Sequence, residues 1–180
     1  MLECVPPIDV AQEAGVDVNN VPRKLSFRCE ALNIPSINMN VHEGRRYTYG
    51  ALEKRPTAPM FNDLTLTFMY DGVAETYDVF HKWLSKIVNF DMSESIAEQG
   101  ENTIFGNAPY ELSYRAEYVT DITLLQFDQT GEVVQATTLR DAHPINLGDL
   151  PLNWSDNNSY LRIPVQISFV DLFTDRQYIS

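Results

Sequence analysis

The chain contains 180 residues, a length that fits one full-sized domain better than two. Hydrophobic residues make up 44% of the sequence and charged residues 21%, so the chain can bury a substantial core and is not expected to be disordered. Its 25 acidic and 13 basic side chains give a net charge of −12. This charge argues against nucleic-acid recognition, which needs a basic surface to replace the counterions of the phosphates.

No apolar run approaches the roughly 18 residues of a membrane-spanning helix, so we expect no membrane association. The first residues lack the basic and then apolar pattern of a secretory signal, and a cytosolic origin is expected. The two cysteines, Cys4 and Cys29, are too few and too widely spaced for a disulfide scaffold or a paired metal site. We expect free thiols at both positions, with Cys29 in the core.

Two early segments show the alternation of a strand. Over residues 23–31 the apolar side chains fall at every second position, which predicts a strand with one face toward a core. Residues 62–71 repeat this pattern and predict a second strand. The predicted inward-facing residues are Leu25, Phe27 and Cys29 in the first segment and Leu64, Leu66 and Phe68 in the second.

Between these strands, residues 39–61 combine two glycines and two prolines with a basic cluster, which is typical of an extended arm or a long hairpin. Residues 1–60 carry seven basic and seven acidic side chains, so the whole net charge lies in residues 61–180. A locally basic protrusion on an acidic body can dock onto a copy of itself, although an ordinary solvated loop explains the cluster equally well.

An amphipathic helix is predicted over residues 73–88, because apolar residues recur there at steps of three and four. We expect this one long helix to lie across a sheet and cover an open face. The side chains expected to pack on the sheet are Tyr77, Phe80, Trp83, Leu84 and Ile87. The polar and acidic residues 91–108 that follow are expected to form a surface insertion.

The second half of the chain returns to strands. Residues 118–127 and 132–139 are rich in strand formers and flank Asp-Gln-Thr-Gly, which predicts a hairpin. Near the C-terminus a further strand is predicted, in which Pro164 favours an edge position or an irregularity. Its inward-facing residues are expected to be Leu161, Ile163, Val165, Ile167 and Phe169. No repeat, low-complexity tract or linker divides the chain, so a single domain is expected over 1–180.

Catalytic and metal-binding patterns are missing from the sequence. The three histidines lie on separate predicted elements without metal-ligand spacing, and no nucleotide-binding or nucleophile motif is present. Asp141, His143 and Asp149 form the nearest acid–base group, but the His-Pro pair indicates a turn. We therefore predict no catalytic residue, no metal and no cofactor, and a mainly β domain with one helix and a protruding arm.

Four blocks of sequence, in their order, resemble the tail tube proteins of contractile-tailed bacteriophages. The resemblance covers roughly residues 23–90 and 114–173. It begins with LSFRCE followed by LNIP, and continues with LTLTF before the predicted helix. It ends with PINLGDL and the alternating strand that follows. The insertion at 91–108, the segment before residue 23 and the tail 174–180 depart from the family pattern.

The resemblance implies two packed antiparallel sheets in a barrel-like fold, with six copies forming a ring around a β-lined channel. Rings would stack into the inner tube or baseplate tube of a virion tail, through which DNA passes without specific binding. The sheath, the baseplate hub and the tape measure protein are the implied partners, with assembly in the host cytoplasm. The implied stacking arm contains Arg45, Arg46, Tyr47, Tyr49, Lys54 and Arg55.

Three other interpretations are compatible with the sequence. The tube protein of type VI secretion systems has a similar fold and would form hexameric rings without phage partners. A monomeric β-barrel binding module would place Trp154, Tyr160 and Tyr178 around a ligand mouth. A small hydrolase would have to use Asp141 and His143. The sequence also leaves open whether a tube ring repeats along the tail or occurs once in the baseplate.

Overall fold

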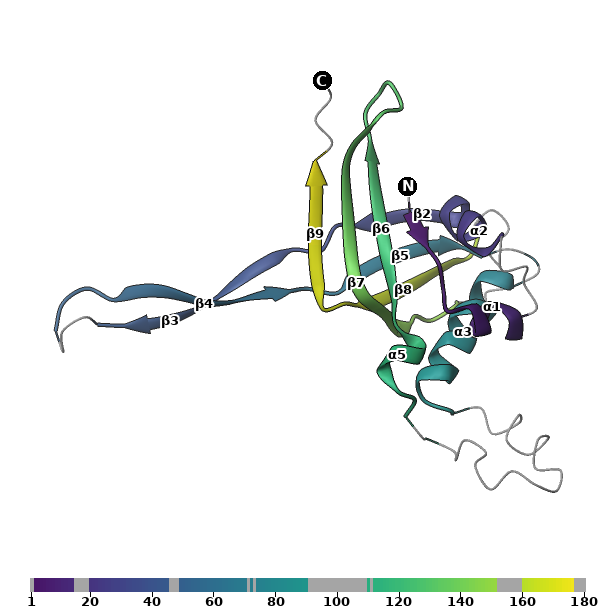
Figure 1. Ribbon diagram of the computed structural model, residues 1–180, viewed down its shortest axis with the longest axis horizontal. Coiled ribbons are helices and arrows are strands. Elements are labelled where there is room, and N and C mark those ends of the chain that lie inside the picture. The colour runs from purple at the N-terminus through teal and green to yellow at the C-terminus, as the bar shows by residue number, and fades with distance from the viewer. Residues whose placement is uncertain are drawn as a thin grey trace.

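The computed structural model shows a mostly β protein with helices packed on one side and a long hairpin on the other (Figure 1). It describes residues 2–14, 20–45, 49–70, 72, 74–90, 110, 112–151 and 160–176. In chain order the elements are β1 (Leu2–Cys4), α1 (Ile8–Glu13), α2 (Val21–Arg28), β2 (Cys29–Asn33), β3 (Ile37–Gly44), β4 (Glu53–Phe61), β5 (Leu64–Met69), α3 (Glu75–Ile87), α5 (Arg115–Tyr118), β6 (Thr120–Phe127), β7 (Val133–Leu147), β8 (Arg162–Ser168) and β9 (Asp171–Arg176).

The strands other than the hairpin form one antiparallel sheet of seven strands that is bent into two halves. The strand order is β1-β6-β7-β8-β5-β2, and β9 also pairs with β7. One half contains β1, β6, β7 and β9, and the other contains β7, β8, β5 and β2. The expected pair of antiparallel sheets is therefore confirmed, with β7 shared by both halves.

A corner in β7 separates the two halves. Residues 135–140 of β7 pair with β9, whereas residues 143–147 pair with β8. Between them, Asp141 has a φ of 53°, in the left-handed region that non-glycine residues rarely adopt. Its N–H donates to Oδ1 of Asp121 at 3.1 Å, and the N–H of Val170 donates to the carbonyl of Arg140 at 3.1 Å. These bonds fix the bend where the strand changes partners.

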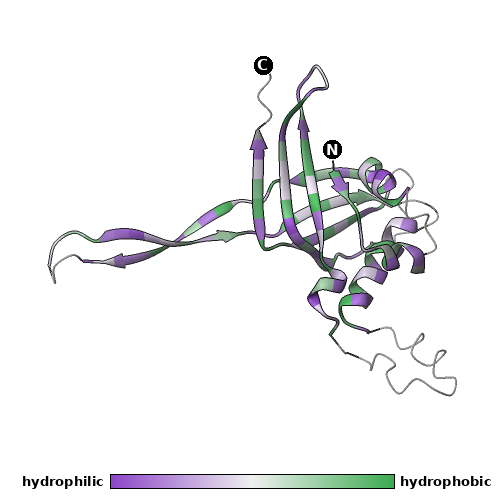
Figure 2. Cartoon of the chain, in the orientation of Figure 1, coloured by the Kyte–Doolittle hydropathy of each residue, from purple (hydrophilic) through white to green (hydrophobic). Residues whose placement is uncertain are grey.

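The core lies between the sheet and the helices. Alternation along β5 and β8 points every second side chain inward, and the green and purple segments of these strands alternate accordingly (Figure 2). The long helix α3 adds Trp83, whose Nε1–H donates to the carbonyl of Tyr118 at 2.7 Å. The fully buried large side chains include Leu2, Leu64, Leu66, Phe68, Phe80, Trp83, Ile122, Leu139, Ile163 and Ile167.

The strand predicted over residues 23–31 is wrong, because residues 21–28 form helix α2. Pro22 occupies the first turn of this helix, where proline is well tolerated. Val21 and Leu25, four residues apart, are buried on one helical face, whereas Phe27 points away from the core and is 85% exposed. The strand begins only at Cys29, which is half-buried rather than fully in the core.

Three further expectations need correction. The His143–Pro144 pair lies inside the long strand β7, not in a turn. Pro164 lies in β8, a strand between β7 and β5, so the expected edge position is wrong; the ladder with β7 ends at the pair of Leu147 with Val165. Residues before 23 contain β1 and α1, and β9 reaches into the tail, none of which the sequence patterns revealed.

Other expectations agree with the structure. Residues 39–61 fall in the β3–β4 hairpin, and β6 and β7 form a hairpin through the turn at Gly131. The insertion at 91–108 lies outside the described residues. None of the helices in the described part of the chain is long and apolar enough to cross a bilayer.

Candidate assembly surfaces

The arm formed by β3 and β4 projects from the body on the side opposite α3 (Figure 1). Eight residue pairs hold its two strands together, from Ile37 opposite Phe61 to Gly44 opposite Glu53, with an irregularity after Asn40. At its base the ring of Phe61 packs against Phe169 with 5.8 Å between the ring centroids. The arm is thus anchored to the body at one end and solvent-exposed along the rest of its length.

The arm has two chemically different faces. Residues directly opposite in an antiparallel pair share a face, and alternate residues along a strand share a face. One face therefore carries Ile37, Met39 and Val41 from β3, together with Phe61, Pro59 and Pro56 from β4. The other face carries Asn38, Asn40 and His42 opposite Met60, Ala58 and Arg55.

Basic side chains of the arm are partly neutralised within it. Lys54 Nζ lies 3.2 Å from Glu43 Oε1, and the Arg55 guanidinium lies 2.7 Å from Glu53 Oε2. Both pairs are solvent-exposed, so each contributes little to stability, but each reduces the local charge available to a partner. Arg45 and Tyr49 are exposed near the tip, and Arg46 and Tyr47 lie outside the described residues.

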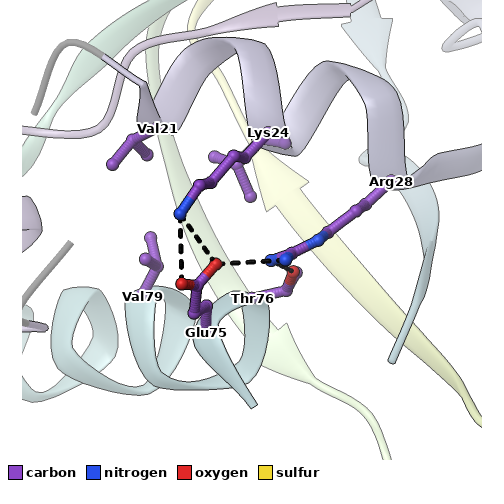
Figure 3. Close-up of a pocket in the computed structure, with 7 residues that line it drawn as sticks. Val21, Lys24, Arg28, Glu75, Thr76 and Val79 are labelled. Atoms are coloured by element: carbon purple, nitrogen blue, oxygen red, sulfur yellow. Dashed lines mark hydrogen bonds and ion pairs between the residues drawn. The ribbon is translucent and has the colours of Figure 1, made fainter. Parts of the chain in front are cut away.

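A cluster of charged side chains joins helix α2 to the start of helix α3 at a small pocket (Figure 3). Lys24 Nζ contacts both carboxylate oxygens of Glu75 at 3.1 and 3.0 Å, and Arg28 contacts Oε2 of the same carboxylate at 3.0 Å. Arg28 also donates to Oγ1 of the buried Thr76 at 3.2 Å. Hydrogen bonding from Lys24 lowers the pKa of Glu75, and that from Arg28 lowers it further. This cluster fixes the position of α2, which the alternation alone did not predict.

A second polar cluster lies at the edge strand β2. The carboxylate of Glu30 accepts bonds from Nε of Arg162 at 2.7 Å and from the hydroxyl of Tyr160 at 2.6 Å. The Arg162 guanidinium lies 4.8 Å from the centre of the Tyr160 ring. These bonds lower the pKa of Glu30, chiefly through Arg162. Tyr160 is thus engaged with β2, while Trp154 and Tyr178, the other aromatics of the alternative ligand mouth, lie outside the described residues.

The residues predicted to pack the helix on the sheet differ in their burial. Phe80 and Trp83 are fully buried and stack on each other, and Phe80 also contacts Phe68 of β5 with ring centroids 5.1 Å apart. Tyr77 and Ile87 are half-buried against the core. Leu84 is half-exposed, and Thr76 and Val79 occupy buried positions that the prediction omitted.

The residues of the predicted C-terminal strand follow one face of β8. Ile163, Val165 and Ile167 are fully buried, and Phe169 packs against the core just after the strand. Leu161 precedes the strand and is half-buried, and its carbonyl accepts a bond from the N–H of Tyr70 at 2.9 Å.

The acid–base residues of the alternative hydrolase are engaged in structural contacts. The carboxylate of Asp141 is paired with Arg115 at 3.1 Å, and His143 Nδ1 lies 3.4 Å from the backbone carbonyl of Asp141 rather than from its carboxylate. The His143 ring packs edge-on against Tyr118. Asp149 lies beyond the end of β7. Among the described residues, no group of three or more metal-ligating side chains comes together.

Strand edges remain open in the described part of the chain. β2 and β1 end the strand order of the sheet, and β9 pairs with β7 only. Such edges expose unpaired N–H and C=O groups that can pair with another chain. Open edges, a projecting hairpin and polar clusters that serve packing define a structural β protein built for association.

The chain belongs to the phage tail tube protein family, whose model matches residues 3–174. It is 24% identical over 165 residues to the tail tube protein gp19 of Enterobacteria phage T6 and, equally, to that of Enterobacteria phage T4. These matches cover 85% of this chain and 83% of each relative. The predicted role as a structural protein of a contractile tail tube is therefore confirmed, and the chain is a virion tail component.

Solved structures share the fold. A chain of the anti-feeding prophage baseplate is similar with a TM-score of 0.51 at 12% identity, covering 83% of this chain and 79% of that one. A chain of the sheath/tube terminator of the extracellular contractile injection system PVC has a TM-score of 0.51 at 12% identity, covering 82% of this chain and 84% of that one. At these identities the likeness concerns the fold alone.

Proposed function

We propose that six copies of the chain form a ring whose sheets join edge to edge around a channel, and that rings stack into a tube. The observation that supports this most is the set of open strand edges at β1, β2 and β9 in the described chain. Each open edge is an aggregation hazard for a monomer and becomes useful when it pairs with a neighbour in a closed ring.

In this proposal the arm is the stacking element between rings. It projects from the body, so it can reach a neighbouring ring without rearranging the core (Figure 1). Arg45 and Arg46, which lie between β3 and β4 in the sequence, are proposed to face the acidic surface of the next ring, whereas Lys54 and Arg55 are already paired within the arm. The double variant Arg45→Glu with Arg46→Glu should fold normally and stack poorly. Normal stacking would exclude this role of the tip.

The channel is proposed to let DNA pass without holding it. Residues 61–180 carry the entire net charge of −12, and an acidic lumen would repel phosphate groups. The carboxylates proposed to face the channel lie in residues 111–175. A ring reconstructed by cryo-electron microscopy would contradict this if its lumen were neutral or basic.

The proposed partners are further copies of the chain in adjacent rings, together with the tail sheath, the baseplate hub or the tape measure protein. Similar folds occur in chains of a prophage baseplate and a sheath/tube terminator, which supports these classes of partner. The role proposed is structural, without catalysis, cofactor or membrane association, and assembly takes place in the host cytoplasm.

The first test is light scattering on the purified chain, with negative-stain images of the same sample. Six-fold rings or tubes are expected, because the open strand edges and the arm would then make contacts between subunits. Since some tube subunits assemble only on an initiating ring, a monomeric sample is then mixed with a preformed baseplate or tube. If no rings form even then, the proposed six-membered ring is wrong.

A further inference from the structure

The apolar face of the arm, made of Ile37, Met39, Val41, Pro56, Pro59 and Phe61, has no cover along most of its length. The side chains of Ile37, Met39 and Val41 are 54%, 60% and 44% exposed, whereas Phe61 at the base packs on Phe169 of the body. A two-stranded hairpin is marginally stable by itself in water. A projecting hairpin with one continuous apolar face is therefore expected to be completed by another protein surface.

A second exposed apolar surface lies beside the C-terminal end of α3. We call it the stem patch, and it consists of Phe90, Tyr110, Leu112 and Tyr114. The last three side chains are 70%, 66% and 83% exposed, and Phe90 is 40% exposed. Tyrosine is enriched in protein interfaces, and so is methionine, which the arm supplies.

The stem patch is held firmly although it is exposed. Leu112 forms an isolated β-bridge with Val88, and the N–H of Tyr110 donates to the carbonyl of Asn89 at 2.7 Å. Ser113 turns toward helix α3, because its hydroxyl donates to the carbonyl of Lys86 at 2.6 Å and its N–H to that of Ile87 at 3.1 Å. Leu112 and Tyr114, on either side of Ser113, consequently point outward.

The two apolar surfaces cannot meet within one chain. The arm leaves the body on the side opposite α3, whereas the stem patch follows the end of α3 (Figure 1). A surface of one copy can bind a different surface of the next copy, and such head-to-tail contacts generate rings or filaments. Charge also favours contact between the arm of one copy and the body of another: the arm, residues 37–61, has four basic and two acidic residues, whereas residues 61–180 carry the whole net charge of −12.

We propose that the apolar face of the arm of one subunit packs on the stem patch of a second copy of this chain. This inference rests on the proposed function and names the surfaces that make the contact between subunits. It differs from docking through the basic tip, because the contact is made by the part of the arm between the body and its two internal ion pairs. The arm brings aliphatic and methionine side chains, and the stem patch brings tyrosine rings with their hydroxyls at the rim.

Adding a single positive charge to either face of the arm tests which face makes the contact. Met39→Lys places an ammonium in the proposed contact, and Asn38→Lys adds the same group on the opposite face of the same strand. On the second surface, Leu112→Lys is compared with Ala116→Lys, an exposed position on α5. We expect Met39→Lys and Leu112→Lys to lower the assembled fraction, measured by sedimentation velocity, by about tenfold or more. Equal assembly by test and control variants would overturn the inference.

Cross-linking tests the pairing directly and separates the inference from the proposed function. Cys29 is first replaced by serine; then a Met39→Cys sample and a Leu112→Cys sample are mixed, assembled and treated with a short bismaleimide. A covalent dimer is expected, and an Asn38→Cys sample should give several-fold less of it. Tubes that form without the Met39–Leu112 cross-link would overturn the inference and leave the tube function intact. Failure of the unmodified protein to associate, alone or on a preformed tube, would overturn both.

Discussion

The backbone N–H of Gly148 donates to the carbonyl oxygen of Pro164 at 2.7 Å, and a Cβ atom on Gly148 would lie 2.4 Å from Cγ of the same proline. The N–H and C=O groups of one strand residue point to the same side, so the hydrogen-bond donor that Pro164 lacks would also point toward Gly148. The last pair of β7 and β8 is Leu147 with Val165, so this gap falls where the ladder ends. A proline can therefore occupy a central strand here.

We predict that Gly148→Ala destabilises the fold by about 1–3 kcal/mol, because the added methyl group overlaps the pyrrolidine ring and the adjacent backbone. The free energy of unfolding in urea measures the effect. Gly72→Ala is the matched control, since nothing lies within 4 Å of a Cβ at that position. A Gly148→Ala variant as stable as the control would show that the end of β7 is free to move.

The buried face of α3 predicts different costs for neighbouring residues. Trp83→Phe should cost about 1–3 kcal/mol, because it removes the Nε1–H bond to the backbone carbonyl of Tyr118 and leaves part of the buried indole's volume unfilled. Leu84→Ala should cost less, since Leu84 lies on the half-exposed side of the helix. The loss of stability of each variant is measured by thermal unfolding and compared. A larger loss for Leu84→Ala would mean that the helix is rotated about its axis.

The Glu75 cluster predicts a defined dependence of stability on pH. Hydrogen bonding to Lys24 and Arg28 lowers the pKa of Glu75 below its ordinary value of 4.5. A group with a lowered pKa in the folded state stabilises the fold above its unfolded pKa and loses that contribution as the pH falls through the folded pKa. The stability advantage of the unmodified protein over Glu75→Gln should be full at neutral pH and shrink below about pH 4.5.

Lys24→Met provides a check on the cause. Removing the Lys24 ammonium, the main hydrogen-bond donor, raises the folded pKa of Glu75 toward its ordinary value, so the acid-dependent loss of stability should become smaller. Urea denaturation at a series of pH values measures both variants. Parallel pH profiles for Lys24→Met and the unmodified protein would show that the ion pair does not form in solution.

Much of the sheet could be predicted from the sequence because β5 and β8 each have one buried and one more exposed face. Apolar residues at every second position indicate such a strand directly. The same reasoning misled at α2, where Leu25, Phe27 and Cys29 also alternate. A long-range contact favours the helix there. Lys24 and Arg28, one helical turn apart, both bind the carboxylate of Glu75, which lies 51 residues after Lys24 and 47 residues after Arg28 in the sequence. A pattern within nine residues cannot contain that information.

The position of the arm could be predicted from the sequence, but the side chains that share each of its faces could not. Glycines and prolines indicated the arm, but the register that pairs Glu43 with Lys54 and gathers Met39 and Val41 on one face exists only once the hairpin has formed. The stem patch was missed because Phe90 and Leu112 are separated by 21 residues in the sequence. The short strand β1 was missed because two inward-facing residues are too few to establish a period.

The two thiols should react at different rates, which tests how the N-terminal strand is packed. Cys4 is fully buried in β1, and burial raises its pKa to about 12; burial also raises the pKa of the half-buried Cys29. Because the thiolate is the reactive form, iodoacetamide near pH 8 should modify Cys29 slowly and Cys4 only when the fold opens. Peptide mass spectrometry reports each site, and both should react fully in urea. Modification of Cys4 at the rate of Cys29 under native conditions would show that β1 detaches from β6 without global unfolding, so that the β1 edge proposed for ring formation would be frayed in the free subunit.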